Sequence, residues 1–334
     1  MRWTMQRMMD LATGYWSAGA LMAAVDLGLF GVLADGEATP EALAGRLQAS
    51  PRHLEGLLRA LAGLGLLEEK GDRYGLAPDA RPYLDPDGER CLLESLRFNA
   101  DLYPLWGRLG DTVRSGSPAI PEGAHLGADP ERTRRFVRGM HSRALGLAPE
   151  LLPALGLPAQ GRLLDAAAGP GTLSRRWAEA NPGLRVEQLD LPPVLDVARE
   201  LAAGSPAGPR IAYRPGSYHE TDPGGPYDAV LFCGALHQEP PEAARRVLAR
   251  LAGALAPGGV LIVADLMRDP GCATPVFAVL FGLTMMLTRS GGGVYAVDEV
   301  EAMLKGIGLE KVSHNAVPSL PYRVVCGSAP AAGG

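Results

Sequence analysis

Two patterns of apolar and polar positions divide the chain. From residue 18 to residue 147, apolar side chains recur at spacings of three and four, which predicts helices that each bury one face. From about residue 151, short apolar runs alternate with helical stretches, which is typical of βαβ units around a parallel sheet. We therefore expect two domains, a helical one over residues 1–147 and an α/β one over residues 148–330.

One segment of the helical half has a different pattern. Thr39 before Pro40, and Ser50 before Pro51, are pairs that predict the starts of two helices. The run LLEEKGDRYGLA then predicts a β-hairpin that turns at residues 70–72. Two helices followed by such a hairpin form a winged helix-turn-helix, so the otherwise all-helical domain should contain this unit.

A winged helix often places its second helix in the major groove of DNA. Here the second helix, residues 51–67, offers only Arg52, His53 and Arg59 as contacts and is otherwise apolar. The chain also has 32 Lys and Arg against 37 Asp and Glu, so its net charge of −5 gives no general attraction to nucleic acid or anionic lipid. We expect this helix to pack, against a second subunit, rather than to bind DNA.

The second half of the chain predicts a doubly wound α/β sheet with an appended pair of strands. The expected strands are residues 162–166, 184–190, 210–215, 227–235 and 259–267, then 309–317 and 322–328. The expected helices are residues 172–182, 192–202, 240–259 and 297–308, with a helical insertion at 273–290. Pro257, Gly258 and Gly259 should end the third of these helices.

Composition narrows the class of protein. With 334 residues, 47% of them apolar, the chain can bury a large core. The longest apolar window, residues 273–287, is too short to span a membrane, and the N-terminal segment is interrupted by Arg2, Arg7 and Asp10, unlike a signal peptide. The four cysteines are far apart and have no histidine array nearby, which argues against disulfides and structural zinc. We therefore expect a cytoplasmic protein without a metal.

The first predicted strand of the α/β half ends in LLDAAAGPG, in which Asp165 is followed only by small side chains and proline through Gly171. In open parallel sheets, ligands lie at the carboxyl ends of the strands, and glycines at the first strand-to-helix turn let the backbone approach them. The next strand ends on Asp190, about twenty residues later, where a carboxylate can accept hydrogen bonds from ribose hydroxyls. This pair of features predicts a nucleoside site.

The spacing does not fit a dinucleotide. A pyrophosphate-binding fingerprint needs a third glycine for close helix packing, and this chain has Thr172, Leu173 and Ser174 in that region. An adenosyl ligand without pyrophosphate therefore fits better.

Several motifs in order resemble one known family over nearly the full length. LLDAAAGPG, LDLPPVL, RPGSYH, the stretch from LFCGALHQEPP to VLIVAD, and MLTRSGGGVYAVDEVEAML resemble the S-adenosylmethionine-dependent O-methyltransferases with an N-terminal winged-helix dimerisation domain. These include hydroxyindole, plant phenolic, bacterial polyketide and pigment methyltransferases. The resemblance implies a class I methyltransferase fold, a Rossmann-like doubly wound sheet, with S-adenosyl-L-methionine as cofactor and a homodimer.

The same resemblance assigns cofactor-binding roles. Gly169 and Gly171 would border the methionine part, Asp190 would hold the ribose and Leu191 would touch the adenine. The remaining candidates are two residues flanking the adenine and two at strand ends: Ser217, Tyr218, Asp165 and Cys233. Ser217 stands where the family often has an aspartate, and Ala167 replaces a common family glycine.

The candidate base is His237, which follows the strand YDAVLFC and aligns with the family's catalytic histidine. A phenol with a pKa of about 10 is mostly protonated at neutral pH, so a neutral histidine with a pKa of about 6.5 can remove its proton. Asp265, which aligns with a flanking acid of the family, would fix the imidazole tautomer. Family members commonly read HDW, whereas this chain has Gln238 and Glu239, and Val294 stands where plant members have a second acid. Orientation and desolvation alone are the alternative route to catalysis.

Apolar side chains from the helical segments would line the acceptor pocket. They are Phe98, Tyr103, Trp106, Phe136, Met140, Phe277, Met285 and Met286, and any single one of them has ordinary core packing as its alternative role. As a set they imply a flat, apolar acceptor such as a phenol, polyketide, indole or pigment. His141, His219 and His314 have no assigned role.

The sequence therefore indicates an S-adenosylmethionine-dependent methyltransferase that acts on a hydroxyl of a small hydrophobic acceptor. Three alternatives remain at this point. They are an enzyme of the same fold with non-methylating chemistry, a carbon or nitrogen methyltransferase, and a winged-helix regulator that binds DNA.

Overall fold

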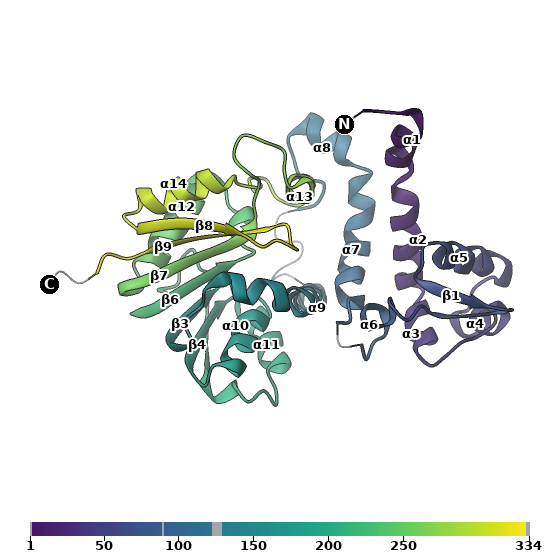
Figure 1. The fold of residues 1–334 in the computed structure, drawn as a ribbon, viewed down its shortest axis with the longest axis horizontal. Coiled ribbons are helices and arrows are strands. Elements are labelled where there is room, and N and C mark those ends of the chain that lie inside the picture. The colour runs from purple at the N-terminus through teal and green to yellow at the C-terminus, as the bar shows by residue number, and fades with distance from the viewer. Residues whose placement is uncertain (1, 89, 122–128, 332–334) are drawn as a thin grey trace. The chain divides into compact units, whose positions relative to one another are not determined.

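The computed structural model of the chain describes residues 2–88, 90–121 and 129–331. The chain forms two compact units, Met1–Pro104 and Leu105–Gly334 (Figure 1). The boundary expected after residue 147 falls inside helix α9, Pro130–Leu155.

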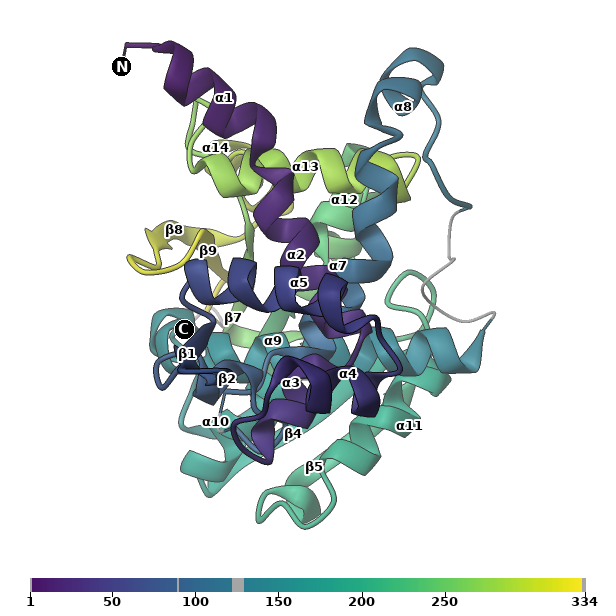
Figure 2. The same ribbon diagram turned by 90° about the vertical axis from the view of Figure 1, so that its right-hand side faces the viewer.

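The first unit is helical apart from one hairpin. Its elements in chain order are α1 Met5–Thr13, α2 Tyr15–Asp26, α3 Leu29–Ala34, α4 Pro40–Leu47, α5 Pro51–Gly63, β1 Leu67–Lys70, β2 Arg73–Leu76, α6 Arg81–Leu84 and α7 Leu93–Trp106. Helices α2 and α7 lie side by side (Figure 1), and the Cβ of any residue replacing Gly19 would stand 3.1 Å from the hydroxyl of Tyr103. Helix α1 precedes α2 and lies beyond its N-terminal end (Figure 2). All residues of α1 are at least partly exposed.

The winged helix-turn-helix prediction is confirmed. Helix α4 begins where Thr39 accepts a hydrogen bond from the backbone of Ala42, and both α4 and α5 have proline in their first turn. Strands β1 and β2 pair antiparallel, from Leu67 opposite Leu76 to Lys70 opposite Arg73. Helix α5 buries three leucines into the core of the unit, whereas its polar Arg52, His53 and Arg59 are exposed. Its apolar face therefore serves packing within the unit.

The second unit is built on a seven-stranded sheet. Its helices are α8 Leu109–Ser115, α9 Pro130–Leu155, α10 Thr172–Ala180, α11 Pro192–Leu201, α12 Pro241–Ala252, α13 Val276–Thr288 and α14 Val297–Gly306, with short 3-10 turns η1 Gly208–Arg210 and η2 Leu236–Gln238. Its strands are β3 Gln160–Ala166, β4 Gly183–Asp190, β5 Ile211–Pro215, β6 Tyr227–Cys233, β7 Leu255–Leu266, β8 Glu310–Ala316 and β9 Tyr322–Ser328. The strand order is β5-β4-β3-β6-β7-β9-β8, with β9 antiparallel to both of its neighbours.

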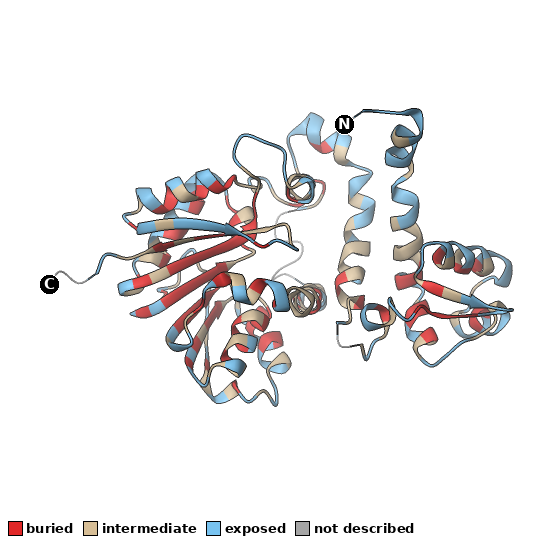
Figure 3. Ribbon diagram, viewed as in Figure 1, coloured by how far each residue is buried: buried red, intermediate tan, exposed pale blue. Residues whose placement is uncertain are grey.

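Alternation along the strands explains the two layers of helices. In β6, Ala229 and Leu231 belong to the core under α9 and α10, whereas Val230 and Phe232 belong to the core under α12 and α14. Helices therefore cover both faces of the sheet (Figure 1), and its central strands are buried along most of their length (Figure 3). This arrangement confirms the doubly wound α/β fold class.

One strand boundary differs from the expectation. We expected the helix to continue to Gly259, but α12 ends at Ala252 and β7 begins at Leu255, because the backbone of Tyr227 donates to Ala254 and Leu255 pairs with Tyr227. The register between β6 and β7 then shifts before Ala229. The segment APGG is thus part of an irregular strand rather than the end of a helix.

Candidate active site

The turn after β3 contains two glycines with different tasks. Both have left-handed backbones, with φ of +55° at Gly169 and +63° at Gly171. A Cβ at Gly171 would lie 2.1 Å from the side chain of Gln188, so this glycine is required by packing against β4. No described heavy atom lies within 4 Å of the place where a Cβ at Gly169 would stand. Gly169 therefore leaves open space beside the backbone, which a ligand can enter.

Asp190 connects the ends of the two neighbouring strands. β3 and β4 run parallel, so their carboxyl ends meet at one edge of the sheet, with Ala166 opposite Leu189. The carboxyl of Asp190 accepts hydrogen bonds of 2.7 Å from the backbone N–H of Gly169 and from that of Leu191. Burial raises the pKa of Asp190 to about 6, and these two hydrogen bonds oppose the rise. The acid thus lies directly against the open turn.

Asp165 lies beneath this edge rather than at its surface. Its carboxyl is buried and accepts a 2.5 Å hydrogen bond from the hydroxyl of Ser174 at the start of α10. Gln188 donates to the same hydroxyl and to the carbonyl of Gly171. Burial raises the pKa of Asp165 to about 7, and the nearby charge of Asp190 adds to the rise. These hydrogen bonds therefore stabilise the turn after β3.

The segment after β5 brings an aromatic residue to the same end of the sheet. The backbone of Gly216 donates to the carbonyl of Asp190, and the hydroxyl of Ser217 accepts from the backbone of His219. The hydroxyl of Tyr218 donates a 2.6 Å hydrogen bond to Glu239, whose side chain is buried. Our sequence reasoning treated Glu239 only as a departure from the family pattern and missed this contact.

His237 lies in η2, just beyond β6, and its imidazole is oriented by Asp265. Nδ1 is 2.7 Å from Oδ1 of Asp265, and the backbone N–H of His237 donates to the other carboxyl oxygen. Asp265 is buried at the end of β7 and also accepts from the backbone N–H of Leu266. Since a carboxylate accepts hydrogen bonds, Nδ1 carries the proton and Nε2 is left as an acceptor. The contact predicted between His237 and Asp265 is thus present in the structure.

A second contact to the imidazole comes from α13. The ring of Phe281 meets that of His237 edge to face, with the ring centres 4.8 Å apart. Phe281 did not figure among the predicted residues, although its spacing of four from both Phe277 and Met285 along a helix is a signal that could have found it.

The chain matches two known protein-family models. Residues 9–86 match the family described as O-methyltransferase dimerisation domain, and residues 106–310 match the family described as O-methyltransferase domain. The chain belongs to the O-methyltransferase family.

Individual relatives match the chain over almost its whole length. The chain is 33% identical to the N,N-dimethyltransferase OxyT of Streptomyces rimosus, over 90% of this chain and 89% of that protein. It is 31% identical to the mitomycin biosynthesis 6-O-methyltransferase of Streptomyces lavendulae, over 95% and 92% of the two chains. The solved structure of PigF with SAH has a TM-score of 0.86 and 25% identity, covering 98% of this chain and 100% of that one.

These findings confirm several of the expectations from the sequence. The chain is a methyltransferase of this family that depends on S-adenosylmethionine, and the fold class and cofactor follow those of its relatives. The comparisons favour neither the DNA-binding regulator nor an enzyme of the same fold with non-methylating chemistry. Among the helices that the structure describes, none is long and apolar enough to cross a membrane.

The remaining candidate residues of this O-methyltransferase differ in their surroundings. At the end of β6, burial raises the pKa of the Cys233 thiol, and the charges of Asp265 and Asp165 raise it further, so the thiol stays neutral. Leu191 and Phe136 both pack on the cluster of Val137, Val194 and Val197.

The residues predicted to line the acceptor pocket differ in burial and in their place in the fold. Met285 is buried in α13, whereas Phe277 and Met286 on the same helix are exposed. Met140 is partly buried in α9. Phe98 and Tyr103 lie on α7 in the first unit, and Trp106 is the last residue of that helix. Their binding roles remain predictions.

His141, which had no assigned role, contacts the helix that follows the glycine turn. Its Nδ1 lies 2.7 Å from the hydroxyl of Thr172, at the start of α10. Burial lowers the pKa of His141 to about 4, and the charges of Arg175, Arg176 and Arg138 lower it further. The imidazole is therefore neutral at physiological pH and serves as a hydrogen-bond partner between α9 and α10.

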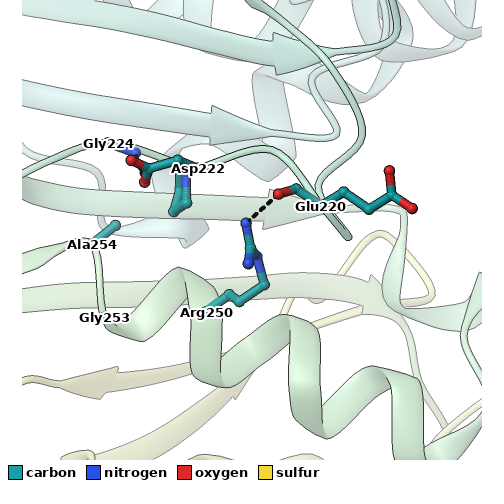
Figure 4. A pocket seen from close by; sticks show the side chains of 7 residues that line it. Glu220, Asp222, Gly224, Arg250, Gly253 and Ala254 are labelled. Carbon is teal, nitrogen blue, oxygen red and sulfur yellow. Dashed lines mark hydrogen bonds between the residues drawn. The ribbon is translucent and has the colours of Figure 1, made fainter.

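A recess of about 380 Å³ lies elsewhere on the second unit (Figure 4). Arg250 donates there to the carbonyls of Glu220 and Thr221. None of the candidate site residues lines this recess. It is therefore separate from the active site.

Proposed function

We propose that the enzyme methylates a hydroxyl group of a small, apolar aromatic acceptor, with His237 as the general base. The hydrogen bond between His237 and Asp265 carries this proposal. Asp265 holds the proton on Nδ1, so Nε2 can take the proton of the acceptor hydroxyl, and the buried carboxylate stabilises the imidazolium that forms. Gln238 and Glu239, which replace the usual residues of the family motif, take no part in this proton transfer.

Asp190 and the space beside Gly169 suit the nucleoside of the cofactor. A carboxylate offers about four acceptor positions. Two are taken by the N–H groups of Gly169 and Leu191, which leaves two for the ribose hydroxyls. Gly171, Leu191, Ser217 and Tyr218 would complete the cofactor site, and when bound S-adenosylmethionine supplies a methyl group activated by its positively charged sulfur. Asp165 supports the turn from below, and the neutral Cys233 adds no charge to the site.

The apolar surface of α13 suits an aromatic acceptor. Phe281 contacts the imidazole directly, and Phe277 and Met286 on the same helix are exposed to a partner or ligand. We place the aromatic ring of the acceptor on this surface because Phe281 lies beside the proposed base. We assign the other wall roles to Met140 and Trp106, whereas Met285 and Phe136 serve chiefly in packing.

The acceptor atom is assigned as oxygen because the site contains a base. A phenol needs to lose its proton during attack, whereas a neutral amine already carries a lone pair, so a dedicated base favours a hydroxyl acceptor. The relative OxyT is an N,N-dimethyltransferase, which keeps nitrogen as the second candidate.

The test combines product analysis with substitution of the base. Purified enzyme given S-adenosylmethionine and a panel of phenols should form S-adenosylhomocysteine and a product heavier by one methyl in equal amounts. His237→Ala should lower turnover by about 100-fold or more, while calorimetry shows unchanged binding of S-adenosylhomocysteine. The control His314→Ala changes an exposed histidine on β8 and should leave both quantities unchanged. Unchanged turnover in His237→Ala would reject the base, and orientation and desolvation alone would then be the better account of catalysis.

The enzyme is further proposed to be a cytoplasmic homodimer. Residues 9–86 match an O-methyltransferase dimerisation domain, and α1 exposes apolar side chains, with Met5 83% and Leu11 68% exposed. Such a surface on a short helix is suited to burial against a second copy.

A further inference from the structure

A departure from the family pattern is in contact with a residue predicted to flank the adenine. Glu239 stands where the family commonly has tryptophan, and Tyr218 is the predicted adenine neighbour. The two residues are 21 positions apart, yet the hydroxyl of Tyr218 is 2.6 Å from Oε1 of Glu239. The hydroxyl on one and the carboxyl on the other thus form a single hydrogen-bonded pair.

The pair is buried and well supported. Glu239 is only 5% exposed, and its Oε1 is also 3.2 Å from Nε2 of His219. The Tyr218 ring packs edge-on against Phe232 and lies under the ring of His219. Burial raises the pKa of Tyr218, and the adjacent Glu239 raises it further, so the phenol keeps its proton and donates it to the carboxyl. A buried carboxyl that lost this donor would be left poorly satisfied.

Each end of the pair belongs to a different part of the active site. Tyr218 follows the end of β5, where the backbone of Gly216 donates to the carbonyl of Asp190. Glu239 ends the η2 turn that carries His237, and its backbone N–H donates to Leu236. The pair is therefore a direct side-chain link between the segment beside Asp190 and the turn that holds the base.

The other sides of the η2 turn are held as well. Gln238 accepts a 2.5 Å hydrogen bond from Arg289, at the end of α13. The backbone N–H of Gly293 donates to the carbonyl of His237, and the hydroxyl of Tyr295 donates to the carbonyl of Glu239. These contacts connect the turn to the acceptor side, whereas the contacts of Glu239 with Tyr218 and His219 connect it to the nucleoside side.

We propose that Glu239 is a positioning residue that acts through Tyr218. It fixes the wall of the nucleoside site relative to the turn that carries His237, so that binding of the cofactor and alignment of the base depend on one another. This inference rests on the roles proposed above for Asp190 and His237. Neither Tyr218 nor Glu239 takes up or releases a proton in the reaction.

A double-mutant cycle tests the link. Tyr218→Phe removes only the hydroxyl, Glu239→Ala removes the acceptor, and Glu239→Gln keeps an acceptor oxygen in its place. We expect Tyr218→Phe and Glu239→Ala each to weaken binding of S-adenosylhomocysteine by about tenfold in calorimetry and to lower kcat by a similar factor, with the acceptor KM little changed. The double variant should be no worse than the more affected single variant, and Glu239→Gln should stay within about threefold of the wild type.

Tyr213→Phe is the matched control. Tyr213 lies on β5, two residues before its end, and its ring packs under Arg199 away from Glu239. This variant should bind S-adenosylhomocysteine within about twofold of the wild type.

The outcomes separate this inference from the function on which it rests. If the wild type binds S-adenosylhomocysteine but Tyr218→Phe matches it in affinity and kcat, the link is rejected and the proposed function stands. Additive losses in the double variant would equally reject the link, because they would mean that the two side chains act independently. If the wild type itself fails to bind S-adenosylhomocysteine, the nucleoside site and the link are both rejected.

Discussion

Ala167 shows how a single residue can be strained at a binding edge. It lies directly after β3 with a φ of +55°, a left-handed backbone that disfavours any residue with a Cβ. The sequence identified Ala167 as a replacement for a common family glycine, but the strain became visible only in the backbone angles. The chain therefore keeps a methyl group at a position whose conformation glycine adopts freely.

Replacing Ala167 by glycine should stabilise the folded enzyme. Relief of the left-handed strain outweighs the greater freedom that glycine has in the unfolded chain, so the free energy of unfolding should rise by about 0.5–1 kcal/mol. Urea denaturation measures this change. Ala168→Gly removes the same methyl group from the next residue, where φ is not positive, and should destabilise the enzyme. A fall in stability for Ala167→Gly would contradict the strain argument.

The site residues that could be predicted share one property. Asp190, His237 and Asp265 follow or end strands, and the carboxyl ends of parallel strands meet at one edge of a sheet, so their neighbourhood follows from the strand pattern. Glu239 could not be found in this way, and the helical spacing of Phe281 from Phe277 and Met285 indicates only that the three share one side of a helix. The contacts of Glu239 with Tyr218 and of Phe281 with His237 connect separate elements, and no local pattern encodes which residues meet.

At the scale of elements, short apolar runs made the central strands predictable. β3, β4 and β6 have apolar residues on both faces and end in turn residues, so their positions were expected within two residues. β7 begins earlier than expected, because Pro257 and Gly258 signal a helix end, whereas pairing of Leu255 with Tyr227 extends the strand through them. Pairing with β6, and not the local proline and glycine, therefore sets the start of β7.

The acceptor wall shows the limit of apolar patterns in helices. Met285 and Met286 are adjacent in α13 and equally apolar, yet the first is buried and the second is 48% exposed. The helix is apolar on all sides, so its sequence does not reveal which side faces the core. Only the packed structure separates core residues from candidates for acceptor binding.

At the scale of the whole molecule, the apolar surface of α1 should be covered by a second chain. Light scattering coupled to size exclusion should give twice the mass of one chain. Met5→Asp combined with Leu11→Asp places charges on this surface and should shift the enzyme toward monomer, because burying an unpaired carboxylate is costly. Val113→Asp on α8, an equally exposed apolar position in the second unit, should leave the mass unchanged. A monomeric wild type would contradict the proposed dimer.

The central claim is that Asp190 and the open turn at Gly169 hold the nucleoside of the cofactor. Calorimetry with S-adenosylhomocysteine tests it most directly, using the wild type, Asp190→Asn, and the control Asp196→Asn on the exposed side of α11. We predict one binding site per chain, affinity weakened about tenfold or more by Asp190→Asn, and wild-type affinity in the control. Equal affinity of Asp190→Asn and the wild type would contradict it.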